Sequence, residues 1–259
     1  MSDVSDWWTT GIIDMEPGRI DIRGRPIQEL IGEVSFAQMI WLMLRGDLPS
    51  KGQAQLLEAA LVAAVDHGPQ APSIAAARMA VTCGLDLNNA MASAVNMLGD
   101  VHGGAGEQAV HMFRQIDQDG DLDATLASWR FAHGKYIPGF GHRFHKPTDP
   151  RAPRLLALVG EAVTAGVCDG RFAQIAIRLE RQLAEDAGRP IPMNIDGATA
   201  VIFAELGFAP ELARGIFCLS RSVGILAHAW EQSQQGGRNK GPTPPGYRWT
   251  YKADDPNPS

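Results

Sequence analysis

Apolar residues recur at helical spacing along most of this 259-residue chain, and that pattern restricts it to a helical fold. Between Leu56 and Val65, and again between Ala90 and Leu98, apolar side chains lie three or four positions apart, as on one face of an α-helix. Further helices are predicted over residues 104–116, 123–132, 152–165, 170–187, 197–206 and 210–232. The alternation typical of a strand occurs only at Arg19–Arg23. We therefore expect an all-α fold in which the helices form one compact body.

Length, charge and cysteine content exclude several classes of protein. The chain is long enough for one large domain or two packed ones, and no apolar run approaches the roughly 20 residues that span a bilayer. The net charge of -6, without a block of lysine and arginine, argues against nucleic-acid binding, although a few converging arginines could still hold a small anion. No secretory signal precedes the helices, and the three cysteines are widely spaced. We expect a cytoplasmic protein with no membrane partner.

Glycine, proline and histidine are concentrated in four connecting segments. These are residues 102–106, 137–142, 190–196 and 236–245. Glycines let the backbone approach a ligand closely, and the rigid helices on either side position what such loops carry. All four segments are therefore candidate functional loops, and residues 236–259 are expected to form an extended C-terminal arm.

Three side chains in these loops are candidates for chemistry. His102 precedes a glycine-rich turn that is expected to open a helix, and His142 ends another glycine loop. Asp196 is predicted at the N-cap of the next helix, a role that capping alone could explain. His111, His133 and His145 lack such a setting and are interpreted as structural. Neither a His-Glu-x-x-His pair nor paired cysteines at ligand spacing occurs, so no metal site is expected.

Five ordered motifs give the chain a resemblance to a known family. The first runs from Ile20–Leu30 through Ser35-Phe36 to Arg45–Pro49. The others are Asp66–Gly68, Val101–Ala105, Gly139–His142 followed by Asp149–Arg151, and finally Asn194–Asp196 with Ser220–Gly224. In this order they resemble the citrate synthase superfamily, and most closely its short members, the stand-alone citryl-CoA lyases. The resemblance implies a citrate synthase-like multi-helical fold over residues 1–259, with a small helical subdomain at about 103–205 inserted in a large one. The chain departs from the family's pattern in one respect. Pro49 and Asp66 lie only 17 positions apart, where citrate synthases have a long helical stretch between the two motifs.

The resemblance also implies a role for each candidate residue. His102, His142 and Asp196 correspond to the catalytic residues of the family. The substrate carboxylates would be bound by His67, Arg151, Arg221 and, from a neighbouring subunit, Arg238, for which Lys240 or Arg248 are alternatives. The coenzyme A moiety would lie on the backbone of Ile137, Pro138, Gly139, Phe140 and Gly141, with Lys146 facing its phosphates.

These assignments predict a citryl-CoA lyase, which cleaves citryl-CoA to acetyl-CoA and oxaloacetate. Asp196 would exchange a proton with the acetyl carbon, His102 would donate to the thioester oxygen, and His142 would take the hydroxyl proton. The alternative is a citrate or 2-methylcitrate synthase, which condenses an acyl-CoA with oxaloacetate and then hydrolyses the thioester. The shortened segment between Pro49 and Asp66 favours the lyase, because it puts efficient thioester hydrolysis in doubt. A non-catalytic acyl-CoA or citrate sensor is the third alternative. No cofactor is expected beyond the coenzyme A of the substrate, and the apolar helices and C-terminal arm predict a homo-oligomer, most simply a dimer.

Overall fold

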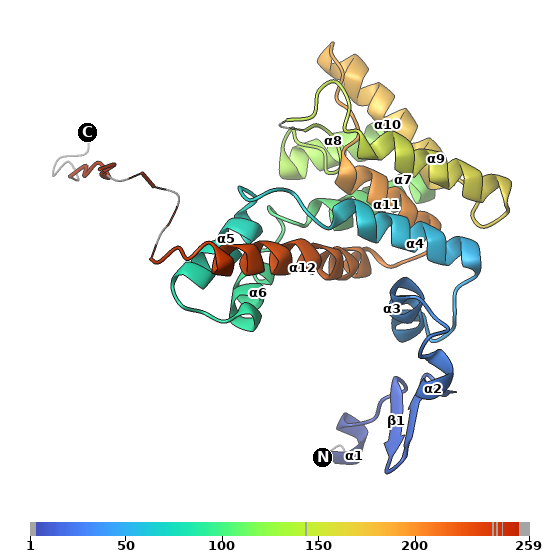
Figure 1. Ribbon diagram of the computed structural model, residues 1–259. Coiled ribbons are helices and arrows are strands. Elements are labelled where there is room, and N and C mark those ends of the chain that lie inside the picture. The colour runs from blue at the N-terminus through green and yellow to red at the C-terminus, as the bar shows by residue number, and fades with distance from the viewer. Residues whose placement is uncertain (1–3, 143, 240, 242, 245, 254–259) are drawn as a thin grey trace. The chain divides into compact units, whose positions relative to one another are not determined.

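The computed structural model describes residues 4–142, 144–239, 241, 243–244 and 246–253 (Figure 1). They divide into two compact units, the first within Met1–Asp66 and Leu98–Val223 and the second within His67–Met97 and Gly224–Ser259. The first unit contains α1 (Val4–Trp7), β1 (Ile13–Glu16), β2 (Arg19–Ile22), β3 (Arg25–Pro26), α2 (Ile27–Leu30), α3 (Phe36–Arg45), α4 (Lys51–Ala64), α7 (Ala105–Asp119), α8 (Leu122–His133), α9 (Arg151–Thr164), α10 (Arg171–Ala187) and α11 (Ile195–Glu205). The second contains α5 (Pro72–Thr82) and α6 (Leu87–Val95), and α12 (Pro210–Gln234) contributes to both.

Helical spacing in the sequence predicts most of these elements correctly. The six helices expected after residue 100 are all present, with ends within three residues of those predicted. Helices α3 and α5 were not predicted. The signal for α3 was missed, because its buried residues Ala37, Ile40 and Trp41 do recur at helical spacing. Helix α5 is rich in alanine and shows only a weak apolar stripe. The expected all-α fold is confirmed, since the described residues are mostly helical.

A small antiparallel sheet precedes the helical body. The strands lie in the order β1-β2-β3, and Ile13 of β1 faces Ile22 of β2. The strand pattern at Arg19–Arg23 therefore corresponds to β2, whereas β1 was not predicted, because its four residues are all exposed and give no buried face. Ile22 packs against Leu30 and Leu42, which connects the sheet to α2 and α3.

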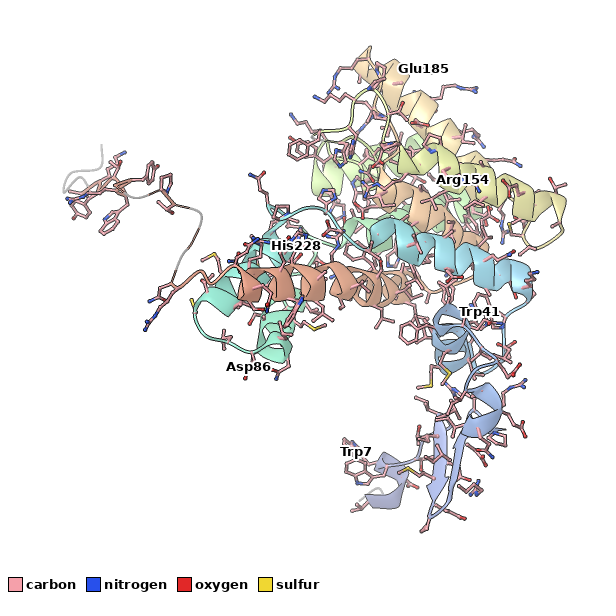
Figure 2. The ribbon with its side chains drawn as sticks, viewed as in Figure 1. Trp7, Trp41, Asp86, Arg154, Glu185 and His228 are labelled. Carbon is pink, nitrogen blue, oxygen red and sulfur yellow. The ribbon has the colours of Figure 1, made fainter. Side chains whose placement is uncertain are left out.

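Helix α11 is the centre of the first unit. It contacts α4, α7, α9 and α10, and every residue from Gly197 to Ala204 is buried (Figure 1). A helix that is apolar on all sides is typical of a protein core. Near one end of this core, Trp41 of α3 packs edge-on against Phe208 at a ring distance of 5.1 Å (Figure 2). The buried helix gives the site at its N-terminus a rigid base.

Two glycines bring the loop 137–142 against the start of α11. A Cβ atom on Gly139 would lie 2.7 Å from the Cα atom of Gly197, and one on Gly197 would overlap the carbonyl oxygen of Gly139. Backbone hydrogen bonds hold this approach, from Asn194 N to Gly139 O at 2.9 Å and from Gly141 N to Pro192 O at 2.7 Å. Only glycine permits this approach, and Gly139 also has a positive φ of 84°.

The second unit has a core of its own. Ala77 of α5, Ala90 and Ala94 of α6, and Ile225 and Ala229 of α12 are fully buried together. Small side chains allow these three helices to lie close to one another. Outside this core, Arg78 donates to Glu231 at 2.7 Å.

The small subdomain predicted at about 103–205 and the C-terminal arm predicted at 236–259 are not tested by this division into units. Residues 103–205 lie wholly within the first unit, so its division from the second does not test that boundary. After α12, the described residues up to 253 form neither helix nor strand. Among the residues that the structure describes, no helix is both long and apolar enough to cross a bilayer.

We predict that Gly197→Ala destabilises the protein by about 1–3 kcal/mol, because the added methyl group overlaps the Gly139 backbone in a buried position. Chemical denaturation would measure this change. Gly160→Ala is a matched control, since Gly160 also lies within a helix and its Cβ would meet nothing within 4 Å. That control should stabilise the protein by roughly 0.5–1 kcal/mol. Equal effects of the two substitutions would contradict the proposed packing.

Candidate active site

Asp196 lies in the first turn of α11, and the structure corrects its predicted position. The N-cap is Asn194, whose side-chain oxygen accepts from the amides of Asp196 at 2.9 Å and Gly197 at 3.2 Å. The Asn194 amide group also donates to the carbonyl of Gly141 at 2.8 Å. Asn194 therefore satisfies the helix end and holds the glycine loop, so the carboxyl group of Asp196 is not needed as a cap.

The charge of Asp196 is poorly solvated. Burial raises the pKa of its carboxyl group, and the positive charges of Arg221 and Arg151 oppose that shift. A carboxylate in such surroundings is a stronger base than one in water, because desolvation disfavours its charged form. Asp196 is thus suited to exchange a proton with a weak acid.

His142 is held in one orientation by two backbone amides. Its Nδ1 atom accepts from Phe144 N at 3.0 Å and from His145 N at 2.9 Å. Because Nδ1 is an acceptor in both bonds, the neutral ring carries its proton on Nε2. Burial, the nearby His145 and Arg151 lower the pKa of His142, against an opposing effect of Asp149. The ring is therefore neutral near pH 7, with a donor on Nε2.

His102 lies in the tight turn that precedes α7, as predicted. Gly103 has a positive φ of 108°, and a Cβ on Gly104 would lie 2.7 Å from the carbonyl oxygen of Asp100. His102 is half-buried, and this burial, together with the charge of Arg221, lowers its pKa. Like His142, it is neutral near pH 7.

Two arginines supply positive charge beside these groups. Arg221 is buried in α12, where its Nε donates to Ala64 O at 3.1 Å. Burial lowers the pKa of its guanidinium, and the carboxylates of Asp196 and Asp66 oppose the shift. Arg151 begins α9 and is held in a two-point ion pair by Asp149, which is fully buried. The ion pair therefore fixes the orientation of the Arg151 guanidinium before any ligand binds.

Electrostatic contacts bring five of the predicted residues together. Arg221 acts on both His102 and Asp196, and Arg151 acts on Asp196, His142 and Arg221. His67 and Arg238 are exposed residues of the second unit, and their participation stays a prediction. Of the alternatives to Arg238, Arg248 is exposed and Lys240 lies outside the described residues.

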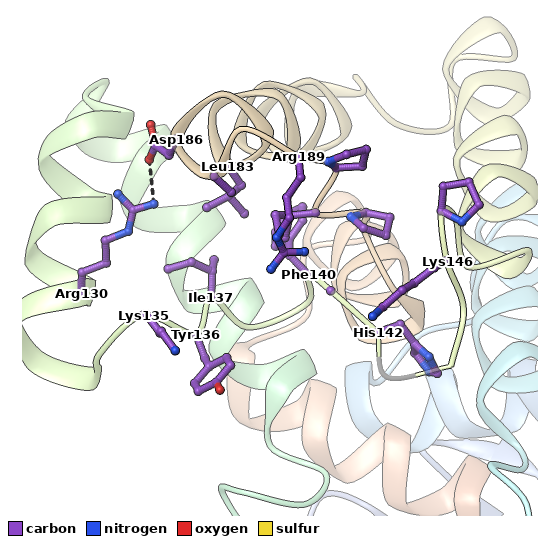
Figure 3. Close-up of a pocket in the computed structure, with 16 residues that line it drawn as sticks. Arg130, Lys135, Tyr136, Ile137, Phe140, His142, Lys146, Leu183, Asp186 and Arg189 are labelled. Atoms are coloured by element: carbon purple, nitrogen blue, oxygen red, sulfur yellow. Dashed lines mark hydrogen bonds and ion pairs between the residues drawn. The ribbon is translucent and has the colours of Figure 1, made fainter.

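A cavity of about 1200 Å³ opens beside His142 (Figure 3). Of the residues predicted to bind coenzyme A, Ile137, Phe140, Gly141 and Lys146 line it. Pro138 and Gly139 are buried and do not contribute to its wall. In Figure 3, His142 and Lys146 lie at one end and Arg130 at the other, where Arg130 pairs with Asp186 at 2.7 Å. The wall combines apolar side chains with cations, as a ligand with an aromatic base and phosphates would require.

The sequence analysis missed several residues that line the cavity or hold the candidate site in place. The cations Arg130, Lys135 and Arg189 line the cavity, although no motif distinguished them from surface residues. His145 was interpreted as structural, yet its ring lies 4.4 Å from that of His142. A signal was available for Asn194, because an asparagine two positions before the acid is itself a preferred N-cap.

Comparisons with known proteins find similar sequences and structures. A citrate synthase from Haloferax volcanii is 31% identical over 214 residues, which are 81% of this chain and 55% of that protein. The chain spans about half the length of the curated relatives that it matches. The structure of a citryl-CoA lyase from Hydrogenobacter thermophilus is similar with a TM-score of 0.83 and 31% identity, covering 97% of both chains.

A more distant structure is similar over part of its length. Citrate synthase from Thermoplasma acidophilum, solved as a ternary complex with carboxymethyl coenzyme A and oxaloacetate, has a TM-score of 0.70 and 25% identity. The likeness covers 86% of this chain and 59% of that one. The family defined by the citrate synthase C-terminal domain matches residues 50–241, well over half of the sequence. The chain therefore belongs to the citrate synthase family.

Proposed function

We propose that this protein is a citryl-CoA lyase, which cleaves citryl-CoA to acetyl-CoA and oxaloacetate. The observation that carries this proposal is the correspondence with the Hydrogenobacter citryl-CoA lyase over 97% of both chains. The curated citrate synthases are longer, and the chain matches only about half of each. The residues that this shorter chain retains include the acid, the two histidines and the arginines of the candidate active site.

Asp196 exchanges the proton of the acetyl carbon in this proposal. In cleavage, the carbon–carbon bond breaks and leaves an enol or enolate of acetyl-CoA, which Asp196 protonates at carbon. The raised pKa of its carboxyl group supports this role, because burial makes the carboxyl group hold its proton more tightly than a carboxyl group in water does. His102 donates to the thioester oxygen, where negative charge develops.

His142 exchanges the other proton, at the oxygen of the oxaloacetate carbonyl. Its Nε2–H gives a proton to the alkoxide in condensation. In cleavage the reverse transfer starts from a ring that has already lost its Nε2 proton, and Nε2 takes the proton of the hydroxyl while Asp196 gives one up. The two amide donors to Nδ1 support this role, since they stabilise the negative charge on a ring that has given up its Nε2 proton. The chemistry uses these side chains, with coenzyme A present only as part of the substrate.

Binding of the substrate follows from the charges around the site. Arg221 and Arg151 are placed to hold carboxylates of the dicarboxylate portion, because a guanidinium matches a carboxylate in shape and charge. The cavity at Ile137–Gly141 would take the coenzyme A portion, with Lys146 near its phosphates. We further propose a homodimer in which Arg238 completes the partner's site.

A citrate or 2-methylcitrate synthase is the second candidate function. Similarity to the Haloferax and Thermoplasma citrate synthases favours it. The two functions differ in one step, because a synthase also hydrolyses the thioester and releases free coenzyme A.

Product analysis is the test that separates these functions. We expect the purified protein to consume citryl-CoA and to release acetyl-CoA and oxaloacetate. Asp196→Asn should lower the turnover number by orders of magnitude with little change in binding, because the substitution removes a proton-transfer group and keeps its shape. Stoichiometric release of free coenzyme A from acetyl-CoA and oxaloacetate would instead identify a synthase. Equal turnover by both proteins would contradict the role of Asp196.

The carboxylate clamp predicts a selective loss of affinity. Arg221→Leu should weaken oxaloacetate binding by roughly 2–5 kcal/mol, because a buried carboxylate loses a charge-assisted partner. Arg151→Leu should act in the same direction. Isothermal titration with oxaloacetate and with coenzyme A would measure both affinities. Arg114→Leu is the control, since Arg114 is partly buried and bonds only to Phe208 O among the interactions described here. Unchanged oxaloacetate affinity in both variants would place the clamp elsewhere.

Subunit mixing tests the proposed contribution of Arg238. An inactive Arg238→Ala protein mixed with an inactive Asp196→Asn protein should regain partial activity, because some mixed dimers contain one complete site. Subunit exchange would be verified by mass spectrometry of the intact dimers. Activity no higher than that of either variant alone, in samples that do exchange, would show that each chain builds its own site.

A further inference from the structure

The turn that carries His102 has little apolar packing of its own. Val101, at its apex, is fully exposed, whereas Leu98 before it is buried. Asp100 lies between them, and its backbone packs closely against Gly104 and accepts from the Gln108 side chain at 3.2 Å. Asp100 is therefore one anchor of the turn that carries His102.

Arg214 of α12 contacts both sides of this turn. Its Nη2 atom lies 2.6 Å from Oδ1 of Asp100, and its Nε atom lies 2.5 Å from Oε2 of Glu107. Glu107 is in the first turn of α7, directly after the turn that carries His102. The Arg214 and Glu107 side chains are 25% and 19% exposed, so this pair is less screened by solvent than the Asp100 pair, whose acid is 78% exposed.

Helix α12 connects this contact to the carboxylate clamp. Arg214 and Arg221 are seven residues apart, which is close to two helical turns and places both on the same face. Arg221 acts electrostatically on His102 and Asp196. One rigid helix thus carries a residue that faces the reacting groups and another that holds the turn of His102.

We propose that Arg214 is a positioning residue, which fixes His102 relative to Arg221 by pairing with Asp100 and Glu107. This inference rests on the proposed function, in which His102 donates to the thioester oxygen. A donor that moves by about 1 Å can cost up to a hundredfold in rate while substrate binding elsewhere is kept. Loss of Arg214 should therefore lower the turnover number more than it raises KM.

The test compares Arg214→Ala and Arg214→Lys with Arg154→Ala in the full chain. Arg154 is a matched control, because it forms an ion pair with Glu161 on the exposed surface of α9 (Figure 2). With citryl-CoA as substrate, Arg214→Ala should lower kcat by about tenfold or more and change KM by less than about twofold. Arg214→Lys should recover part of the loss, and Arg154→Ala should match the wild type. An unchanged kcat in Arg214→Ala would overturn the proposal.

Two further measurements separate this inference from the proposed function. Hydrogen exchange of residues 98–104 should be faster in Arg214→Ala, and the pKa of His102, followed by NMR, should rise because the loosened ring is less buried. If the wild type does not cleave citryl-CoA while both changes occur, the function is wrong and the positioning role of Arg214 stands. If neither changes, the positioning role fails whatever the activity. Should Arg214→Ala not fold, Glu107→Gln removes the charge of the less exposed partner and is expected to give the same changes. No change in that variant would also overturn the proposal.

Discussion

The direct contact between the Gly139 and Gly197 backbones is the constraint on which the active site depends. It places the loop that carries His142 against the helix that carries Asp196, and a single methyl group at either position would prevent that approach. The hydrogen bonds from Asn194 hold the same two segments together at the helix end. Since α11 is buried on all sides, its N-terminus cannot shift to accommodate a change in the loop.

The charges around Asp196 are balanced between two opposing effects. Burial makes its carboxylate a stronger base, and the neighbouring guanidiniums prevent the pKa from rising further. Arg151 is in turn held by the buried Asp149, so the local positive charge is fixed in place. Such preorganised charges need little rearrangement during a reaction. The acid is consequently kept reactive by groups that belong to three different helices, α9, α11 and α12.

The sequence predicts the helices well where an apolar stripe faces the core, as in α7 and α10. It gives little contrast between the faces of the alanine-rich α5, whereas the apolar spacing of α3 was present and was overlooked. His102, His142 and Asp196 were found because each lies in a glycine-rich or proline-rich loop that matches a family motif. No motif distinguishes Asp100, Glu107 or Arg214. Their ion pairs join α12 to α7 and the turn before it, which are distant in sequence and meet only in the folded chain.

The separation of the helix cap from the acid has a consequence for how this protein can change. Asn194 satisfies the start of α11, so the side chain at position 196 can vary without unwinding the most buried helix of the first unit. The scaffold and the cavity beside His142 therefore do not depend on the side chain at position 196. Under the proposed function, one substitution there would give a protein that still binds its ligands and no longer converts them, which is a short evolutionary path from catalyst to receptor.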